Sequence, residues 1–173
     1  GDNSSGELGD GTNYNRSTPV QVTGLEGVVA AAAGSFHSLA VKADGTVWAW
    51  GSNSSGELGD GTTTQRRTPV QVTGLEGIVS VAAGSSHSLA VKADGTAWAW
   101  GDNSSGELGD GTKYNRSTPA QVTGLEGGVA AAAGAFHSPA VTADGRGGAW
   151  VYNRPCELSA GTTRQRATPP PGG

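Results

Sequence analysis

The stretch GDNSSGELGDGT at residues 1–12 decides how this chain is organised, because it recurs at a fixed interval. It returns as GSNSSGELGDGT at residues 51–62 and as GDNSSGELGDGT at residues 101–112, and a degenerate copy, VYNRPCELSAGT, occupies residues 151–162. A period of 50 residues indicates stacked structural units that share a core with their neighbours. We therefore divide the chain into repeats at residues 1–50, 51–100 and 101–150, followed by a degenerate partial repeat at residues 151–173.

The composition excludes several classes of protein. A formal net charge of −4 argues against a general nucleic-acid binder, because such proteins usually present a basic patch or stripe. No apolar run is long enough to cross a bilayer. The only cysteine, Cys156, cannot form an internal disulfide. The sequence begins inside a repeat and without a methionine, so we expect it to be a segment of a longer array or an excised piece of one.

The clearest element of the repeat is a hairpin, SLAVKADGTVWAW, at residues 38–50. Its Asp44-Gly45 pair is typical of a two-residue turn, because glycine accepts a positive φ without steric cost. That turn would set three cross-strand pairs: Val41 with Trp48, Leu39 with Trp50, and Ala40 with Ala49. One face of the hairpin would then be bulky and the other small, and we expect the tryptophan side of one blade to pack on the alanine side of the next.

Two further segments complete each repeat. The first predicted strand is residues 28–33, and the fourth is residues 68–72, with residues 18–22 as its equivalent. Pro69 indicates an edge position for the fourth strand, because proline cannot donate to the ladder. Short strands with turn signals between them predict an all-β fold, a partial β-propeller of about three four-stranded antiparallel blades with a 50-residue repeat.

The order of four signatures along each repeat resembles a known family. The pattern G-x-N-x-x-G-E-L-G-x-G-T is followed by T-P-V-Q-V, then by V-A-A-G-x-x-H-S-L-A-V, and then by D-G-x-x-W-A-W-G. This succession is similar to the regulator of chromosome condensation repeat, and the match covers nearly the whole chain. The resemblance implies seven-bladed propellers. It places the chain in a family that includes an exchange factor for the small GTPase Ran, a plant UV-B photoreceptor and a bacterial inhibitor of β-lactamases. The near-identical copies look most like bacterial arrays.

Three repeats and a remnant do not close a seven-bladed ring. An open arc leaves strand edges exposed, so the chain is expected to be part of a longer ring, to complete a ring as a homodimer, or to carry edges prone to aggregation. The last third adds to this concern. Pro139 replaces a strand leucine, Gly147-Gly148 replaces Val47-Trp48, and the chain ends in TPPPGG. We predict that residues beyond about 139 pack poorly, because proline and paired glycines weaken strands.

Acidic residues and histidines invite a metal-binding or catalytic interpretation that their spacing does not favour. The acidic loop residues Asp2, Glu7 and Asp10 match no calcium-loop pattern, so we favour a solvated loop rich in turns. The histidines that recur once per repeat are His37, His87 and His137. Equivalent atoms on successive blades would lie too far apart to share one ion, so we expect structural histidines that hydrogen-bond a nearby loop. We predict no metal, no cofactor and no catalytic residue.

The tryptophans could instead stack on a ligand or sense light. The resembling photoreceptor carries tryptophan in the short G-x-x-H turn, but that turn reads GSFH, GSSH and GAFH here. The tryptophans of this chain lie on the third strand of each repeat: Trp48, Trp50, Trp98, Trp100 and Trp150. Packing between blades is therefore the favoured interpretation.

Strand connectivity predicts where a partner would bind. Connections alternate between the two ends of an antiparallel meander, so the GSFH turn and the long loop at residues 51–67 share one end, and the ADG and TGLEG turns share the other. The positions that vary between repeats collect at the GSFH end. Aromatic residues and arginine are enriched at interface cores, although ordinary exposed loop residues would look the same. The predicted partner-binding residues are Tyr14, Arg16, Phe36, Arg66, Ser86, Tyr114, Arg116 and Phe136. The resemblance agrees, because the photoreceptor and the β-lactamase inhibitor both use loops on one propeller face.

These observations predict a non-catalytic scaffold for protein–protein interaction, with no nucleic-acid partner and no membrane span. The alternatives are an activity like that of a guanine nucleotide exchange factor, an enzyme, or a truncated array fragment without independent function. The sequence shows no insertion that could serve as an exchange factor's wedge, and it clusters no nucleophile, base and oxyanion donor. An extracellular or cell-surface location is favoured over a cytoplasmic one.

Overall fold

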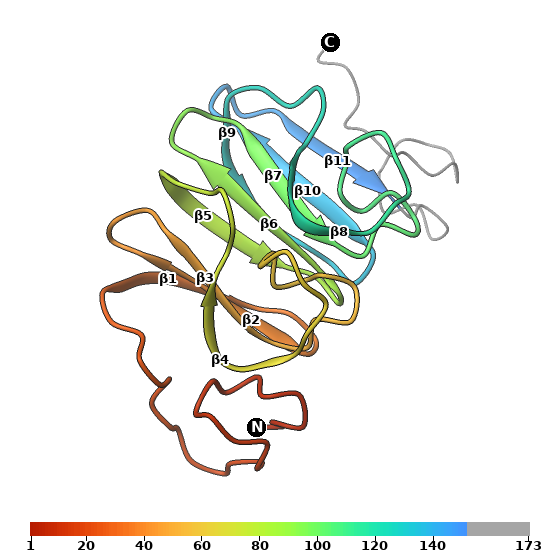
Figure 1. Cartoon of the computed structure of the whole chain (residues 1–173). Coiled ribbons are helices and arrows are strands. Elements are labelled where there is room, and N and C mark those ends of the chain that lie inside the picture. Colours follow the sequence, from red (N-terminus) through yellow and green to blue (C-terminus); the bar gives the residue numbers. More distant parts are fainter. Residues whose placement is uncertain (152–173) are drawn as a thin grey trace.

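A computed structural model describes residues 1–151, and within this range the chain is built from strands with no helix (Figure 1). Blade 1 consists of β1 (Val28–Ala33), β2 (His37–Lys42), β3 (Val47–Gly51) and β4 (Arg66–Gln71). Blade 2 consists of β5 (Ile78–Ala83), β6 (His87–Lys92), β7 (Ala97–Gly101) and β8 (Arg116–Gln121). Blade 3 consists of β9 (Gly128–Ala131), β10 (His137–Thr142) and β11 (Gly147–Val151). The described residues contain no helix that could span a membrane.

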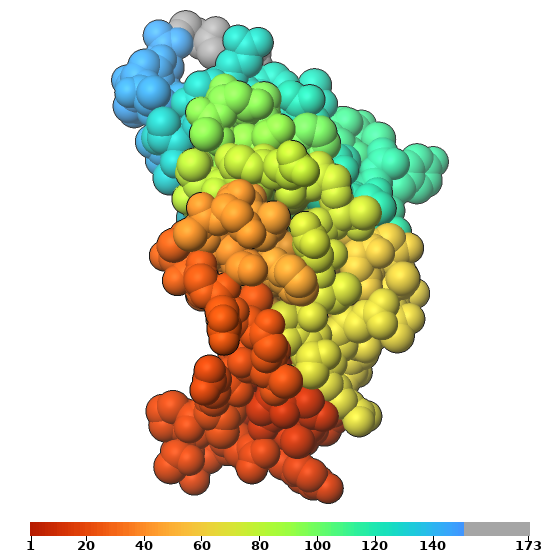
Figure 2. All heavy atoms as spheres, turned by 60° about the vertical axis from the view of Figure 1, so that its left-hand side comes forward, coloured from red at the N-terminus to blue at the C-terminus, as the bar shows by residue number. Residues whose placement is uncertain are grey.

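Each blade is an antiparallel sheet in which neighbours in sequence are neighbours in space. The strand orders are β1-β2-β3-β4, β5-β6-β7-β8 and β11-β10-β9. The sheets stand one after another along the chain, and residues near the N-terminus lie at the opposite end of the molecule from β11 (Figures 1 and 2). The predicted all-β, partial-propeller architecture is confirmed.

The fourth strand begins earlier than the sequence predicts. β4 starts at Arg66, which pairs with Gly51 across a register shift in the ladder with β3. The predicted edge position of Pro69 is confirmed, because β4 is the last strand of its sheet. The prediction of a strand at residues 18–22 is wrong. β4 and β8 each pair with the strand before them, and no such strand lies beside residues 18–22 within the described range.

The hairpin register differs by one residue from the prediction. The observed pairs are Ser38 with Trp50, Leu39 with Ala49, Ala40 with Trp48 and Val41 with Val47. Lys42 N donates to Thr46 O at 3.0 Å, so the loop holds three residues rather than two. Gly45 closes it with a φ of 79°, as expected of a type I turn followed by a left-handed residue. A shift of one residue moves every side chain to the other face.

The corrected register defines two faces for each blade. The Leu face carries Leu39, Val41, Val47 and Ala49 in blade 1, and Leu89, Val91, Ala97 and Ala99 in blade 2. The Trp face carries Ser38, Ala40, Trp48 and Trp50 in blade 1, and Ser88, Ala90, Trp98 and Trp100 in blade 2. In blade 3 the Leu face is Pro139, Val141, Gly147 and Ala149, and the Trp face is Ser138, Ala140, Gly148 and Trp150.

The core lies between blades. The Leu face of blade 1 packs with Ala90 and Trp100 of blade 2, and with Leu58, Val72 and Leu75 from the connection between them. The Leu face of blade 2 packs in the same way with Ala140 and Trp150 of blade 3. The prediction that tryptophans pack between blades is confirmed, although each tryptophan faces leucine and valine as well as alanine.

The prediction that residues beyond about 139 pack poorly is wrong for residues 139–151. β10 includes Pro139 and pairs with β11 throughout its length from His137 to Val141. Trp150 is fully buried and Ala140 nearly so. Their burial against blade 2 outweighs the weak strand propensity of the segment. Residues 152–173, with the TPPPGG end, lie outside the described residues.

Pro139 costs the sheet one hydrogen bond rather than a strand. Its carbonyl still accepts from Ala132 N at 3.0 Å, but the ring nitrogen has no hydrogen to return to the Ala132 carbonyl. β9 accordingly ends at Ala131, two residues before the positions where β1 and β5 end. Val141 lies opposite Gly147 and is left 46% exposed.

Candidate partner-binding surface

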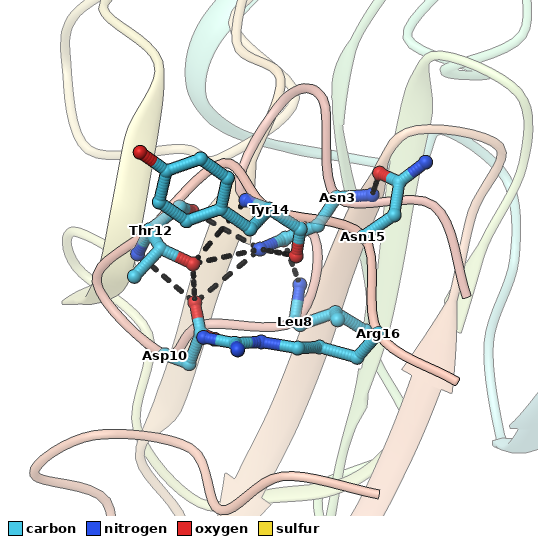
Figure 3. Close-up of polar contacts among 7 residues, drawn as sticks. All are labelled: Asn3, Leu8, Asp10, Thr12, Tyr14, Asn15 and Arg16. Carbon is cyan, nitrogen blue, oxygen red and sulfur yellow. Dashed lines mark hydrogen bonds and ion pairs between the residues drawn. The ribbon is translucent and has the colours of Figure 1, made fainter. Parts of the chain in front are cut away.

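The glycine-rich loop folds around one buried asparagine in each repeat (Figure 3). In the first repeat Leu8 N donates to Asn3 Oδ1 at 2.8 Å. Asn3 Nδ2 donates to the carbonyl oxygens of Thr12 at 3.1 Å and Tyr14 at 3.2 Å. Asn53 and Asn103 make the same bonds in their own repeats. The backbone that carries Tyr14 is therefore held in place while its ring stays outside.

Aspartate–arginine pairs close the same loops. Arg16 donates to Asp10 Oδ2 from Nε at 3.0 Å and from Nη2 at 2.8 Å, and Thr12 donates to Asp10 Oδ1. The Thr12 hydroxyl, followed by Arg16, holds the pKa of the Asp10 carboxyl well below its usual range. Arg66 and Arg116 pair with Asp60 and Asp110 in the same geometry. The predicted binding arginines are thus half-buried parts of the loop framework, and sequence reasoning missed this role.

The loops are tied to the end of each blade where the G-x-x-H turn lies. Ser38 Oγ donates to Glu7 O at 2.9 Å, and Trp50 Nε1 donates to the same carbonyl at 2.7 Å. Glu57 and Glu107 receive equivalent bonds from the following blades. Because Ser38 and Trp50 stand next to the Phe36 turn in the β2–β3 ladder, Tyr14 and Phe36 emerge at the same end of blade 1.

The opposite end collects the other two turns, as connectivity predicts. Ile78 N donates to Gly45 O at 3.1 Å, and Ala43 N donates to Gly27 O at 2.9 Å, so the ADG and TGLEG turns lie together. At the first end, Ser52 N donates to Phe36 O at 2.8 Å, so the long loop starts beside the G-x-x-H turn. The eight predicted residues therefore belong to loops at one end of the blades, which we call the loop face.

Aromatic rings dominate the exposed part of the loop face. Tyr14, Phe36, Tyr114 and Phe136 are 73%, 51%, 75% and 52% exposed. They occur in the first and third repeats. In the second repeat the equivalent positions carry Thr64, which is exposed, and Ser86, which is half-buried. The loop face thus presents two aromatic pairs separated by a polar repeat.

A shallow groove of small residues lies where β1, β5 and β9 end. It has a volume of about 230 Å³, and its lining is Ala33, Gly34, Ser35, Ala83, Gly84, Ser85, Ala133, Gly134 and Ala135. Ser35 Oγ and Ser85 Oγ lie 3.0 Å apart across two blades. The recurring A-G-S or A-G-A before each histidine was the sequence signal for this groove.

The histidines join blades instead of holding a metal or a loop. His37 Nε2 lies 2.9 Å from Ser88 Oγ, and Ser88 donates its own hydrogen to Glu57 O. His37 Nε2 must therefore be the protonated nitrogen of a neutral ring. Burial lowers the pKa of His37 to about 4. Burial, followed by the charges of the neighbouring histidines, lowers the pKa of His87 to about 3.

The acidic loop residues do not converge on a common point. Asp2 accepts from Asn3 N and from Ser4, whereas Asp10 accepts from Thr12 and Arg16. Within residues 1–151 no group of three or more histidine, cysteine, aspartate or glutamate side chains could hold a metal ion. Asp44 bonds Thr46 in the ADG turn, at the opposite end of the blade from His37.

The fold and the loop face define a class: a β-propeller segment that presents braced loops at one end. The profile described as the Regulator of chromosome condensation (RCC1) repeat matches residues 1–41, 44–91 and 94–141, and a second profile of the same description matches residues 28–57 and 78–107. The chain belongs to the RCC1 repeat family.

Known relatives agree with this assignment. Protein pim1 of Schizosaccharomyces pombe is 48% identical over 42 residues, which are 24% of this chain and 8% of that protein. Human WBSCR16 superposes with a TM-score of 0.84 at 24% identity, over 98% of this chain and 45% of that one. Yeast RCC1 (Prp20), in a crystal structure with Kap60, superposes with a TM-score of 0.84 at 22% identity, over 98% of this chain and 42% of that one. At these identities the likeness shows the fold alone, and the chain spans less than half the length of these structures.

Proposed function

We propose that this chain is a non-catalytic scaffold that binds a protein partner through the loop face. The observation that supports the proposal most strongly is the set of four exposed aromatic rings on loops braced by buried asparagines. Aromatic side chains supply much of the energy of protein interfaces, tyrosine especially at hot spots. A braced loop also loses little conformational freedom when a partner binds, so more of the contact energy appears as affinity.

The relatives support a protein as the class of partner. One yeast structure contains RCC1 (Prp20) with Kap60 bound, and a second, at 24% identity, is described together with the binding of Prp20p to Gsp1p and histones. Those partners belong to the yeast protein. For this chain they favour a protein partner over a small molecule.

Exchange-factor activity is the second candidate, because Prp20p is described with Gsp1p. It predicts that the chain accelerates release of a fluorescent guanine nucleotide from a small GTPase. Release at the intrinsic rate, across a panel of GTPases, would exclude this candidate and leave the scaffold. An array fragment without independent function would show neither exchange nor a saturable partner.

A photo-crosslinking experiment tests the scaffold. A photoreactive phenylalanine analogue replaces Tyr14 or Tyr114, and a matched control places it at Glu126, which is exposed on a TGLEG turn at the opposite end. The proposal predicts a discrete crosslinked protein from positions 14 and 114 that is absent from position 126. Equal crosslinking from all three positions, or none from any, would contradict it.

A further inference from the structure

The contact between blades occurs twice in the described residues, and both times it has the same direction. The Leu face of blade 1 receives the Trp face of blade 2, and the Leu face of blade 2 receives the Trp face of blade 3. Two unlike surfaces therefore meet at each junction. A contact of this kind can be extended by adding further blades at either end.

A directional hydrogen bond crosses each junction. His37 Nε2 lies 2.9 Å from Ser88 Oγ, and His87 Nε2 lies 3.0 Å from Ser138 Oγ. The histidine always belongs to the earlier blade and the serine to the later one. Each serine gives its own hydrogen to a loop carbonyl, so its oxygen is positioned to accept from the histidine before it.

The N-terminal end of the array carries one unmatched half of this junction. Leu58, Val72 and Leu75 are buried at the junction of blades 1 and 2. Their counterparts in the first repeat, Leu8, Val22 and Leu25, are only half-buried, because no Leu face covers them. Within residues 1–151, Ser38 also has no histidine from an earlier blade, although it already donates to Glu7 O.

The other end carries the opposite half. Val141 on the Leu face of blade 3 is 46% exposed, whereas Val41 and Val91 are 1% and 0% exposed at the two completed junctions. His137 is half-buried, whereas His37 and His87 are buried. The two unmatched halves lie at opposite ends of the molecule (Figure 2).

We propose that a second copy of this chain docks head to tail, with its blade 1 Trp face on the blade 3 Leu face of the first. His137 of one copy then bonds Ser38 of the next, as His37 bonds Ser88 within a chain. The contact joins two different surfaces, so it forms a closed ring if the rotation closes and an open string of copies if it does not. It uses the ends of the array and not the loop face, so it is independent of the proposed function.

The blade 3 Leu face is smaller than its counterparts, and this makes the proposal testable by gain of affinity. Pro139 stands where blade 1 has Leu39, and Gly147 stands where blade 1 has Val47. A Pro139→Leu, Gly147→Val variant restores the apolar surface that buries the next Trp face. We expect the dissociation constant between copies to fall at least tenfold, measured by light scattering over a concentration series.

A disulfide trap tests the direction of docking. Ser35 and Ser85 place their Oγ atoms 3.0 Å apart within the chain, so head-to-tail docking would bring Ser35 of one copy beside Ala135 of another. We would mix chains carrying only Ser35→Cys with chains carrying only Ala135→Cys, both in a Cys156→Ser background, under mild oxidation. The intrachain pair Ser35→Cys, Ser85→Cys is the positive control that cysteines at this position can join.

Head-to-tail docking predicts that the mixed disulfide exceeds either same-variant disulfide at least tenfold. It also predicts that the mass in solution rises with concentration, and rises earlier for the Pro139→Leu, Gly147→Val variant. The proposal is overturned if the intrachain control closes while the mixture gives the statistical ratio of the three disulfides. A mass of one chain at every concentration, for both the native and the restored Leu face, also overturns it.

Discussion

At the residue scale, a few buried polar side chains do the work that a larger core does elsewhere. Asn3, Asn53 and Asn103 each replace a secondary structure by hydrogen-bonding the backbone of an irregular loop at several points. The sequence indicates that the loop is important because it recurs. It does not reveal the asparagine as the centre, because those bonds join residues up to 11 positions apart in irregular backbone.

Replacing Asn53 with alanine should destabilise the fold substantially. Leu58 N and the carbonyl oxygens of Thr62 and Thr64 would lose their partner in a partly buried loop. Each unsatisfied group costs on the order of 1–3 kcal/mol, so we expect a loss of about 3 kcal/mol in the free energy of unfolding, measured in urea. Ser54→Ala, at an exposed position of the same loop, is the control and should change it by less than about 0.5 kcal/mol.

The buried histidines should make the fold sensitive to mild acid. Burial lowers the pKa of His37 to about 4 and, with the neighbouring histidines, that of His87 to about 3, from 6.5 in the unfolded chain. Between pH 6.5 and about 4 the unfolded chain therefore binds more protons than the folded chain, and stability falls as the pH falls. Each histidine should cost on the order of 2 kcal/mol at pH 4.5.

Melting temperature measured from pH 7 to pH 4.5 checks this effect. The carboxyl of Asp10 has a lowered pKa, so its contribution is lost only at lower pH than this window. A His37→Asn, His87→Asn variant should be less stable at pH 7 but should show a flatter dependence on pH. An equally steep dependence in the variant would assign the effect to other groups.

At the element scale, the period and the alternation of strands predict most of the fold, and the exact register escapes them. Asp44-Gly45 fits a two-residue and a three-residue loop equally well, and the structure selects the second because Asp44 caps Thr46. The early start of β4 depends on an irregular ladder to β3. The shared end of the loop-face residues follows from connectivity alone, whereas the bracing of Arg16 by Asp10 depends on the folded loop.

Two glycines of the second repeat separate backbone strain from packing at this scale. Gly59 has a φ of 66°, and a Cβ there would lie 2.8 Å from Trp100 Nε1. Gly74 has a φ of 71°, and a Cβ there would meet nothing within 4 Å. Gly74→Ala should cost about 1 kcal/mol of left-handed strain, and Gly59→Ala should cost about 2 kcal/mol more because the tryptophan must move. Chemical denaturation compares them, and equal losses would mean that the loop does not pack on Trp100 as described.

At the scale of the whole molecule, the chain is an open arc in which each blade completes the core of its neighbour. Stability is therefore shared along the array, and every junction is both a core and an interface. The arc leaves the loop face independent of the junctions, so a partner can bind the loops without disturbing the stacking. The sequence indicates the arc from the number of repeats, but it does not show that blade 3 still packs, because the burial of Trp150 outweighs the local effect of Pro139.

The affinity of a crosslinked partner for two variants tests the central claim, that the aromatic rings of the loop face form a protein-binding surface. The first variant changes Tyr14, Phe36, Tyr114 and Phe136 to alanine. The control changes Glu26, Glu76 and Glu126, exposed at the opposite end, to alanine. We predict at least a hundredfold loss of affinity for the aromatic variant, at unchanged melting temperature, and less than a twofold change for the control. An aromatic variant that keeps its affinity within twofold would contradict the account.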